Sequence, residues 1–462
     1  MPTHSTPAAR EGSIGPDEAQ TFRRRWIPLV GMEGTFKPGR ERPGAFSSQK
    51  YAQNEILEWV IVGGGVQGTY LSHLLLRRFG LSRRSIRVID PYREPLHRWK
   101  WFADNVGMSS LRSPAVHHLD LASLSLKRFK PQGTTSAVSD AESAASFLAP
   151  YGRPSLRLFN LHAEEIIRRN RLDTIRIKGL ACGLKLIEGG LEVAFVSDSS
   201  SESRLAARRV ILAVGMSDQR CWPEWALQLR AAGAPIVHIL DPGFSRRSLC
   251  DFRNAVVYGG GLSAAQVALS LAGKCPGAVT LVTRHDFRIH LFDSEPSWQG
   301  PNFMRSFALE PDPAKRREII ARERHRGSLT PEAKEELDAA VASGAVGLVR
   351  IESEPHAAFG AHSSVELVIP GRRIDCDLIV LATGYDRKRP GGEWLDRAVE
   401  ELGLPCGPCG FPIVDPSLQW RPGLYVAGPL AELELGPVAR NIAGAHRAAA
   451  RLEYFLLEKG RL

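Results

Sequence analysis

Three glycines, Gly63, Gly65 and Gly68, follow the apolar run LEWVIV and precede a helical run. Glycines at these intervals permit a tight turn, a close approach of the backbone to a phosphate group, and close packing of the helix on the strand. The helix N-terminus would offer unpaired N–H groups and a positive dipole end to a pyrophosphate. Asp90 ends the next apolar run, where a carboxylate can hold ribose hydroxyls. These residues together predict a dinucleotide-binding site.

A second glycine turn lies at Gly259 and Gly261, again between an apolar run and a helical run, with Ala264 in the third position. The apolar run that follows, AVTLVTR, ends in Arg284 instead of an acid. A guanidinium can pair with the extra phosphate of NADP, which a carboxylate would repel. The second turn therefore favours NADPH over NADH, with Arg288 a near rival of Arg284 for the phosphate.

The two turns belong to an alternation of β-rich and helical runs, which predicts an α/β fold with two Rossmann-like dinucleotide-binding domains. RRVILAVG precedes the second turn and DLIVLATGY follows the unit around it, and we interpret both as strands that return beside the first nucleotide site. The second domain is then inserted into the first. We expect the first domain at 55–250 and 375–462, the second at 251–374, and a helical insertion near 311–345.

Small residues end several of these apolar runs. Gly215 ends RRVILAVG, and Thr383 and Gly384 end DLIVLAT. We expect the backbone to pass close to a cofactor at these positions, with Tyr385 over the mouth of the cofactor site. The alternative is that these residues simply end a buried strand. Gly428 ends a late strand before the C-terminal helix, whose start would stabilise negative charge on a flavin ring.

Composition excludes several classes of function. The 462 residues carry a formal charge of +10, but the basic residues are dispersed and no aromatic-interleaved stripe accompanies them, so we expect no nucleic-acid partner. Two long uncharged stretches, 59–76 and 255–273, each contain a triple glycine, and we expect neither to span a membrane. The N-terminus lacks an apolar signal core, which predicts a cytoplasmic protein. Residues 1–54 are rich in Pro, Gly, Ser and charge and predict a disordered arm. The sequence does not determine the oligomeric state, and a homo-oligomer is one of the alternatives.

Seven cysteines are spread along the chain, which fits reduced thiols. Cys406 and Cys409 have the spacing of a redox dithiol, but their Gly/Pro loop lacks the helix N-terminus that lowers a thiol pKa. We interpret the pair as part of a structural loop, with redox catalysis as the alternative. The sequence shows no further Cys/His cluster at zinc spacing, so we expect no metal site.

The arrangement of these motifs resembles the two-dinucleotide flavoproteins, more narrowly the class B flavin monooxygenases, and within them the lysine and ornithine N-hydroxylases. Asp377, Leu381–Tyr385 and Pro390 fit that family's pattern of Asp, three residues, Leu or Phe, Ala-Thr-Gly-Tyr, four residues, and His or Pro. Ser263 matches the family's NADPH turn. Trp101 lies in a segment similar to the family's Trp-containing segment after the ribose-binding acid.

The resemblance implies FAD in the first domain, NADPH in the second, and a monooxygenase that hydroxylates a small amine or amino acid with O₂ through a C4a-hydroperoxyflavin. Because the cofactor carries this chemistry, we assign no catalytic acid or base. The family's Phe-x-Asn-Glu is here Phe292-Asp293-Ser294-Glu295, with Ser294 in place of the substrate-contacting Asn. We expect Asp293, Ser294 and Glu295 on the substrate side, where carboxylates can hold an ammonium. An FAD/NAD(P)H reductase or oxidase without oxygen transfer is the alternative, and an FAD-bound interaction protein is a third hypothesis.

Overall fold

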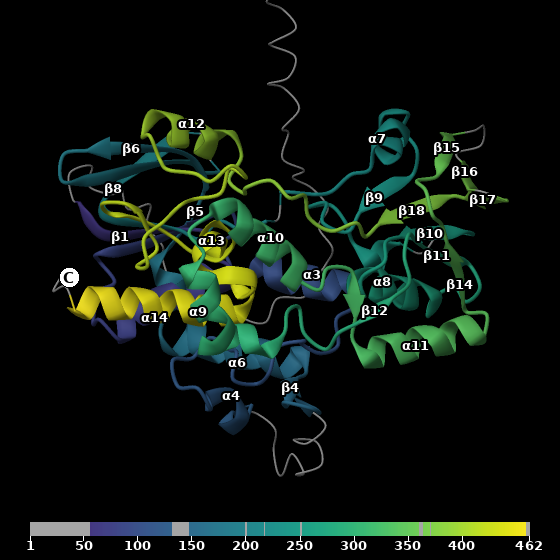
Figure 1. The fold of residues 1–462 in the computed structure, drawn as a ribbon, viewed down its shortest axis with the longest axis horizontal. Coiled ribbons are helices and arrows are strands. Elements are labelled where there is room, and N and C mark those ends of the chain that lie inside the picture. Colours follow the sequence, from purple (N-terminus) through teal and green to yellow (C-terminus); the bar gives the residue numbers. More distant parts are fainter. Residues whose placement is uncertain are drawn as a thin grey trace, which may run out of the picture. The chain divides into compact units, whose positions relative to one another are not determined.

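Two largely parallel sheets organise the chain (Figure 1), and both belong to one compact unit. The computed structural model describes residues 56–131, 147–198, 201–216, 218–249, 252–359, 364–369 and 371–458. The arm predicted at residues 1–54 lies outside these ranges.

The first sheet has eight strands in the order β19-β20-β8-β1-β2-β5, and β6 and β7 extend it from β8 as an antiparallel meander. Its strands are β1 (Leu57–Val62), β2 (Ile86–Asp90), β5 (Arg176–Lys178), β6 (Leu180–Ile187), β7 (Gly190–Val196), β8 (Glu202–Leu212), β19 (Gln419–Arg421) and β20 (Leu424–Val426). β1 is parallel to both β2 and β8. It is apolar on both faces because helices and strands cover both faces of the sheet there.

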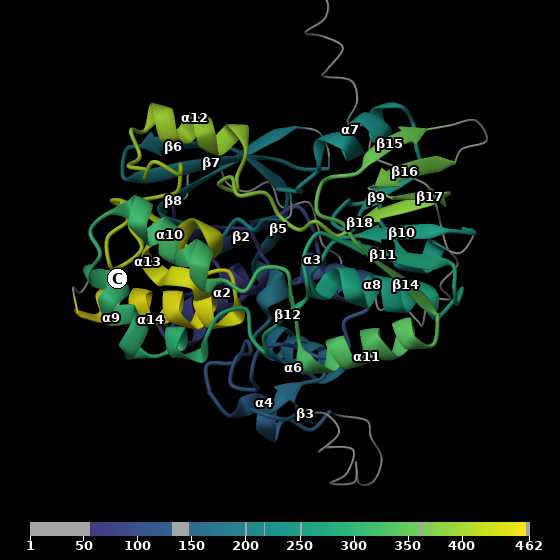
Figure 2. The same cartoon turned by 45° about the vertical axis from the view of Figure 1, so that its right-hand side comes forward.

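Helices pack around this sheet, and α2 and α14 lie against each other (Figure 2). α6 begins at Ser155, whose hydroxyl accepts a hydrogen bond from the N–H of Leu158, a typical N-cap. The helices of this region are α2 (Val66–Arg77), α3 (His97–Val106), α4 (Ser125–Arg128), α6 (Leu156–Arg169), α9 (Pro301–Leu309), α10 (Pro313–Glu323), α12 (Glu393–Glu401), α13 (Glu432–Leu435) and α14 (Ile442–Glu458).

The second sheet has five parallel strands in the order β14-β11-β10-β18-β9. These strands are β9 (Ile236–His238), β10 (Ala255–Tyr258), β11 (Val279–Thr283), β14 (Val346–Arg350) and β18 (Leu378–Leu381). One apolar core lies between this sheet and the helices α8 (Leu262–Ala272) and α11 (Pro331–Ala342). A second core lies under α7 (Glu224–Ala231) and the meander β15 (His356–Phe359), β16 (Val365–Ile369) and β17 (Arg372–Cys376). Two short pairs, β3 (Phe147–Leu148) with β4 (Arg153–Pro154) and β12 (Arg288–Ile289) with β13 (Ser328–Leu329), complete the strands.

The predicted α/β class, with one dinucleotide-type unit inserted into another, is confirmed, but the placement of β18 was wrong. We expected this strand to return beside the first nucleotide site, and it lies between β10 and β9 in the second sheet instead. The expected boundaries at 250 and 375 therefore cut off two strands of that sheet. A strand that is apolar on both faces fits the centre of either sheet, so its own residues do not identify its partners. β8 joins the first sheet beside β1, as predicted.

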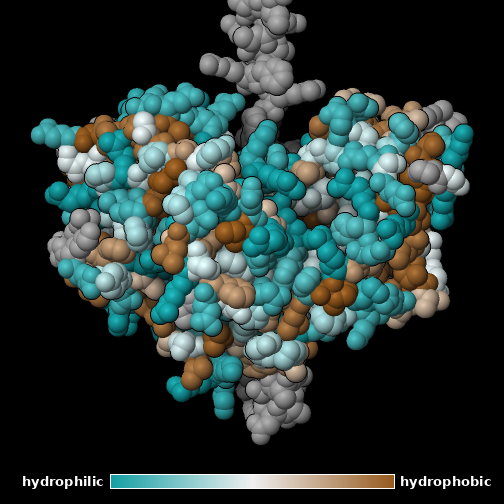
Figure 3. All heavy atoms as spheres, in the orientation of Figure 1, coloured by the Kyte–Doolittle hydropathy of each residue, from teal (hydrophilic) through white to brown (hydrophobic). Residues whose placement is uncertain are grey.

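Hydrophobic residues lie in small scattered groups among hydrophilic ones on the face shown in Figure 3. The coloured residues on this face therefore form no broad apolar patch. Among the described residues, none of the helices combines the length and hydropathy needed to cross a bilayer.

Candidate nucleotide and substrate site

The first glycine turn packs tightly at two of its three predicted positions. A Cβ added at Gly63 would lie 2.4 Å from the carbonyl oxygen of Ala213, and one at Gly68 would lie 1.8 Å from that of Gly63. Gly65 is the N-cap of α2, and no atom lies within 4 Å of an added Cβ there. The turn thus leaves open space at the positive end of a 12-residue helix, and this space fits a pyrophosphate.

Asp90 ends β2 as predicted, and its carboxylate is already engaged. It accepts hydrogen bonds from the N–H groups of Gly64 (2.6 Å) and Tyr92 (2.9 Å) and lies 3.2 Å from the guanidinium of Arg176. Burial lowers the pKa of Arg176, and the charge of Asp90 opposes that shift. The Arg176 guanidinium also donates to the carbonyl of Gly64 at 3.2 Å, so this neutral pair holds the first glycine turn in place. Sequence reasoning missed Arg176, since it stands in no recognisable motif.

The second glycine turn abuts the end of β18. A Cβ added at Gly259 would lie 2.5 Å from the carbonyl oxygen of Ala382, and one at Gly261 would lie 3.1 Å from the Cα of Gly327. This close approach requires glycine at position 259, and the turn that the end of β18 meets is the second one and not the first. A Cβ added at Gly384 would have no neighbour within 4 Å. Thr383 donates a hydrogen bond to the carbonyl of Cys221. Its hydroxyl also lies 3.1 Å from Nε2 of His238.

A cavity of about 720 Å³ opens between the two sheets' helices. Val66, the first residue of α2, lines this cavity together with the whole second turn, Gly259–Ser263. Thr383–Tyr385 and Arg440–Ile442, at the start of α14, form further parts of the wall. The starts of three helices therefore face one space, and Ser263, Thr383, Gly384 and Tyr385 all lie at its edge.

Trp101, a predicted cofactor contact, does not line this cavity. Its ring packs against the core of the second sheet, with the guanidinium of Arg98 3.9 Å from the ring centroid. Trp99 and Phe102 on the same helix line the cavity instead. Residues two positions apart on a helix point in different directions. Of the two tryptophans, Trp99 and Trp101, only one could therefore face the cavity.

Gly215 and Gly428 follow the adjacent strands β8 and β20, and neither lines the cavity. Gly215 has open space around an added Cβ, whereas Gly428 has a left-handed φ of 64° and approaches the side chain of Gln67. The Gln67 amide donates to the carbonyls of Ala439 (3.1 Å) and Asn441 (3.0 Å). This contact fixes the start of α2 against the start of α14.

Arginine dominates the charge of the cavity. We call the arginines that line it the arginine wall: Arg112, Arg284, Arg288, Arg324, Arg326, Arg387 and Arg440. Arg284, the predicted ligand of the NADP phosphate, is largely exposed and pairs with Glu354 at 3.0 Å. Arg288 lies in the same wall, so both rivals remain in place for that role. The wall fits anionic cofactors.

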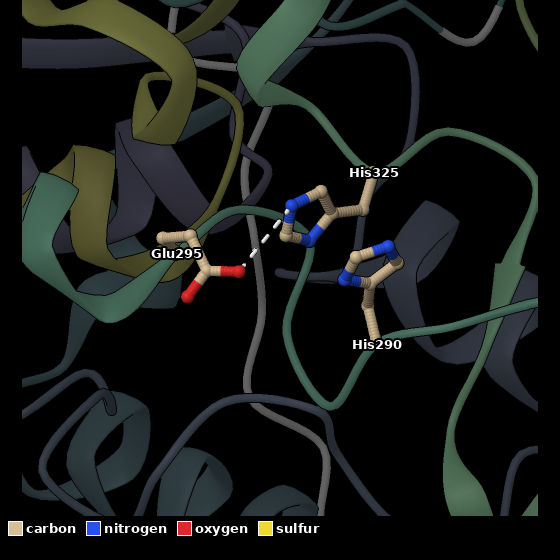
Figure 4. Close-up of side chains that lie close together, drawn as sticks. All are labelled: His290, Glu295 and His325. Atoms are coloured by element: carbon tan, nitrogen blue, oxygen red, sulfur yellow. Dashed lines mark ion pairs between the residues drawn. The ribbon is translucent and has the colours of Figure 1, made fainter.

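The three predicted substrate residues take different positions. Asp293 lines the cavity, but its carboxylate forms an ion pair with Arg112 at 2.9 Å. Ser294 is buried and does not line the cavity. Glu295 points toward His325, with 3.6 Å between Oε1 and Nε2 (Figure 4). Of these three residues, only Asp293 has a carboxylate that lines the cavity, and that carboxylate is already paired with Arg112.

His290, Glu295 and His325 form a group that the sequence did not signal, with ligand atoms within 4.8 Å of one another (Figure 4). The two imidazoles are stacked with 3.6 Å between centroids, and His325 Nδ1 lies 3.1 Å from the carbonyl oxygen of Phe292. Arg112 donates to the carbonyls of His290 and Phe292 in the same loop. A metal cation here would meet this guanidinium, which disfavours it electrostatically.

The Cys406–Cys409 loop lies away from the cavity wall. Cys406 packs against the core of the first sheet and Cys409 against a separate core beneath α9 and α10. Burial raises the pKa of the Cys406 thiol, and the charge of Arg389 only partly opposes this. A protonated thiol is a poor nucleophile, so the structure favours the structural interpretation of this loop.

A buried ion network stands behind the arginine wall. Glu432 is completely buried and accepts two hydrogen bonds from Arg440, at 2.6 and 2.8 Å, and another from Arg317. Burial alone would raise the pKa of Glu432, but the hydrogen bonds and charges of both arginines lower it below its usual value. The network therefore holds the Arg440 guanidinium in one orientation at the cavity.

Replacing Glu432 by Gln should destabilise the protein by about 3–5 kcal/mol, because it leaves two guanidiniums partly buried without their counter-ion. Urea unfolding followed by fluorescence measures this change. Glu366→Gln is the matched control, since Glu366 pairs with Arg373 on the surface, and a surface pair contributes about 0–1 kcal/mol. Equal effects of the two substitutions would contradict the structural role of the buried network.

Comparisons with known proteins show which solved structures share this fold. No protein-family model matches the sequence, and no curated protein matches it. The structure is similar to FAD-bound DfoA of Erwinia amylovora, the desferrioxamine biosynthetic pathway cadaverine monooxygenase, with 16% identity, 87% of this chain and 94% of that chain covered, and a TM-score of 0.67. It is also similar to the ornithine N-hydroxylase KtzI of Kutzneria sp. 744, with 13% identity, 88% and 100% coverage, and a TM-score of 0.66. Bacillithiol disulfide reductase Bdr of Bacillus cereus gives 15% identity, 88% and 100% coverage, and a TM-score of 0.55. These likenesses confirm the predicted fold.

Proposed function

We propose that the protein is an FAD-dependent, NADPH-using monooxygenase that hydroxylates a small amine or amino acid, with O₂ as second substrate. The observation that carries this proposal is the shared cavity, into which the start of α2 and the second glycine turn both open. FAD at the first turn and NADPH at the second would bring their reactive rings together in this space. The likeness in fold to a cadaverine monooxygenase and an ornithine N-hydroxylase supports the same chemistry.

The residues of the chain would bind and orient these groups. The N–H groups at the starts of α2 and α8 would hold the two pyrophosphates, and Arg284 or Arg288 would pair with the extra phosphate of NADPH. Trp99 and Phe102 would limit water near the reacting atoms, since both line the cavity with aromatic rings. When bound, the cofactors supply hydride transfer and oxygen activation. One oxygen atom of O₂ would go to the substrate and the other to water, with NADPH as the two-electron donor.

NADPH should bleach the bound flavin without oxygen. Oxygen added without substrate should restore the oxidised spectrum slowly, because the cavity excludes water, and should release one peroxide per reduced flavin, because O₂ is then the only acceptor of the two electrons. A substrate should accelerate this return and leave with one added oxygen atom. Stopped-flow absorbance of the purified holoprotein, with mass analysis of the product, makes the measurement. Immediate return with one peroxide per NADPH, whatever substrate is present, would instead identify an oxidase or reductase. A protein that binds no flavin would refute both hypotheses.

A further inference from the structure

We infer that the substrate of this cavity is a small amine that carries a net negative charge and whose carboxylate or phosphate group binds Arg324 and Arg440. The inference rests on the proposed function, because it concerns the same cavity, and it specifies the class of substrate. It reverses the expectation that carboxylates at Asp293 and Glu295 hold an ammonium group.

Arg324 and Arg440 lie where α14 begins, among the helices of the first sheet. Arg324 follows α10, and its Nη1 donates to the carbonyl of Pro437 at 2.8 Å. Arg440 directly precedes Asn441 and Ile442, which also line the cavity. Figures 1 and 2 both place α14 with the first sheet and α8 with the second. The two arginines thus belong to the wall that faces the nucleotide-binding turn before α8.

Each guanidinium keeps nitrogen atoms available to a ligand. Arg440 uses Nε and Nη2 to bind Glu432, which leaves Nη1 without an acceptor among the described residues. Arg324 uses Nη1, and its Nε is buried, so Nη2 is the nitrogen of this guanidinium that has no acceptor among the described residues and is left for a ligand. N–H groups from two neighbouring guanidiniums match the paired oxygens of a carboxylate or phosphate.

No acid among the described residues forms an ion pair with Arg324. Its nearest acids serve other arginines, since Asp293 pairs with Arg112 and Glu432 with Arg440. Burial and the adjacent charge of Arg440 lower the pKa of Arg324 to about 10, as two close cations require. A buried cation without a counter-ion raises the free energy of the folded protein, and an anionic ligand would remove this destabilisation.

Other residues that line the cavity would hold the phosphates of NADPH. A Cβ added at Gly260, in the second turn, would lie 2.7 Å from the ring of His285, and one at Gly327 would lie 3.4 Å from Nη2 of Arg288. These groups surround the start of α8, where the pyrophosphate is expected. Arg324 and Arg440 remain for another anion. A substrate ammonium, by contrast, meets no unpaired acid among the described residues of the wall.

The test is isothermal titration calorimetry of the full chain, loaded with FAD and saturated with NADP⁺ so that the nucleotide phosphates occupy their own sites. Three five-carbon probes differ in end-group charge: glutarate has two carboxylates, 5-aminopentanoate one carboxylate and one ammonium, and 1,5-diaminopentane two ammoniums. Glutarate should bind about 30-fold more tightly than 1,5-diaminopentane, with 5-aminopentanoate between them. Arg324→Gln should weaken glutarate binding at least about tenfold. Arg322→Gln is the matched control, because Arg322 is exposed on α10 and pairs with Glu323.

Several outcomes would overturn the inference: tighter binding of the diamine, no heat with glutarate at about 10 mM, or equal effects of the two substitutions. Glutarate binding that disappears once NADP⁺ is present would assign the anion site to the nucleotide phosphates instead. Each of these results is read from a protein that carries flavin, so the proposed function can survive them. Absence of flavin or of NADPH-dependent flavin reduction would refute the proposed function itself.

Discussion

Gly68→Ala should abolish flavin binding and destabilise the first sheet. The added Cβ would lie 1.8 Å from the carbonyl oxygen of Gly63, which belongs to the backbone of a tight turn and cannot move aside without displacing α2 from β1. Overpacking of this kind typically costs 1–3 kcal/mol (roughly) even where a side chain can adjust, and here the obstacle is main chain. Flavin content after purification and the midpoint of urea unfolding measure the two effects.

Gly65→Ala separates packing from ligand binding in the same turn. Gly65 has a φ of −72°, which alanine adopts, and its added Cβ would have no neighbour within 4 Å. We therefore expect unchanged stability of the flavin-free protein but a large loss of flavin affinity, because the methyl group would occupy the space left for the pyrophosphate. Gly243→Ala, at another open glycine, should change neither quantity. Normal flavin binding in Gly65→Ala would contradict the assigned pyrophosphate position.

The glycine turns and the strands that enter them were predictable from sequence because their constraints are local. Gly63, Gly68 and Gly259 each face a backbone carbonyl across a turn, and only glycine tolerates that distance. Asp90 likewise ends its strand at the predicted position. The period of apolar residues and the position of a glycine within a few residues of a strand end are properties that a single sequence displays.

The rest depends on pairing between distant segments. β18 looks the same whether it lies in the first or the second sheet, and its parallel pairing with β10 joins residues more than a hundred positions apart. Arg176 and Arg324 likewise acquire their surroundings from segments far along the chain, at Asp90 and Pro437. Neither arginine belongs to a recognisable motif, so the order of residue types along the sequence does not mark them as functional. The positive charge of the cavity could therefore be recognised only from the three-dimensional structure.

A cluster of buried histidines should make the protein sensitive to mild acid. The cluster connects α2, α6, α14 and the segment between α3 and α4. His73, His117, His118 and His162 are buried, and the half-buried His446 packs against them. The rings of His118 and His162 lie 5.0 Å apart, and those of His117 and His446 lie 5.8 Å apart. Burial lowers the pKa of each one, to about 4 for His117 and His162.

The sign of the effect follows from proton binding. An unfolded histidine has a pKa of about 6.5, so between pH 6.5 and 4 the unfolded chain binds protons that the folded protein excludes. Stability is therefore fully present above about pH 6.5 and falls as the pH drops toward 4. A shift from 6.5 to about 4 corresponds to roughly 2 kcal/mol per histidine already lost at pH 5. Several such groups would consume much of a typical stability of about 5–15 kcal/mol.

Urea unfolding of the FAD-saturated protein from pH 7.5 to 5 measures this loss. His162→Gln should reduce the loss by about 2 kcal/mol, because glutamine does not titrate and its amide can replace the 2.8 Å contact between Nε2 and the Ser125 hydroxyl. His356→Gln, at an exposed position on β15, should leave the pH dependence unchanged. A stability that stays constant over this range, or a His162→Gln variant with the slope of the unaltered protein, would show that the cluster accepts protons without cost. The acid sensitivity would then have to come from carboxylates, whose contribution begins below about pH 5.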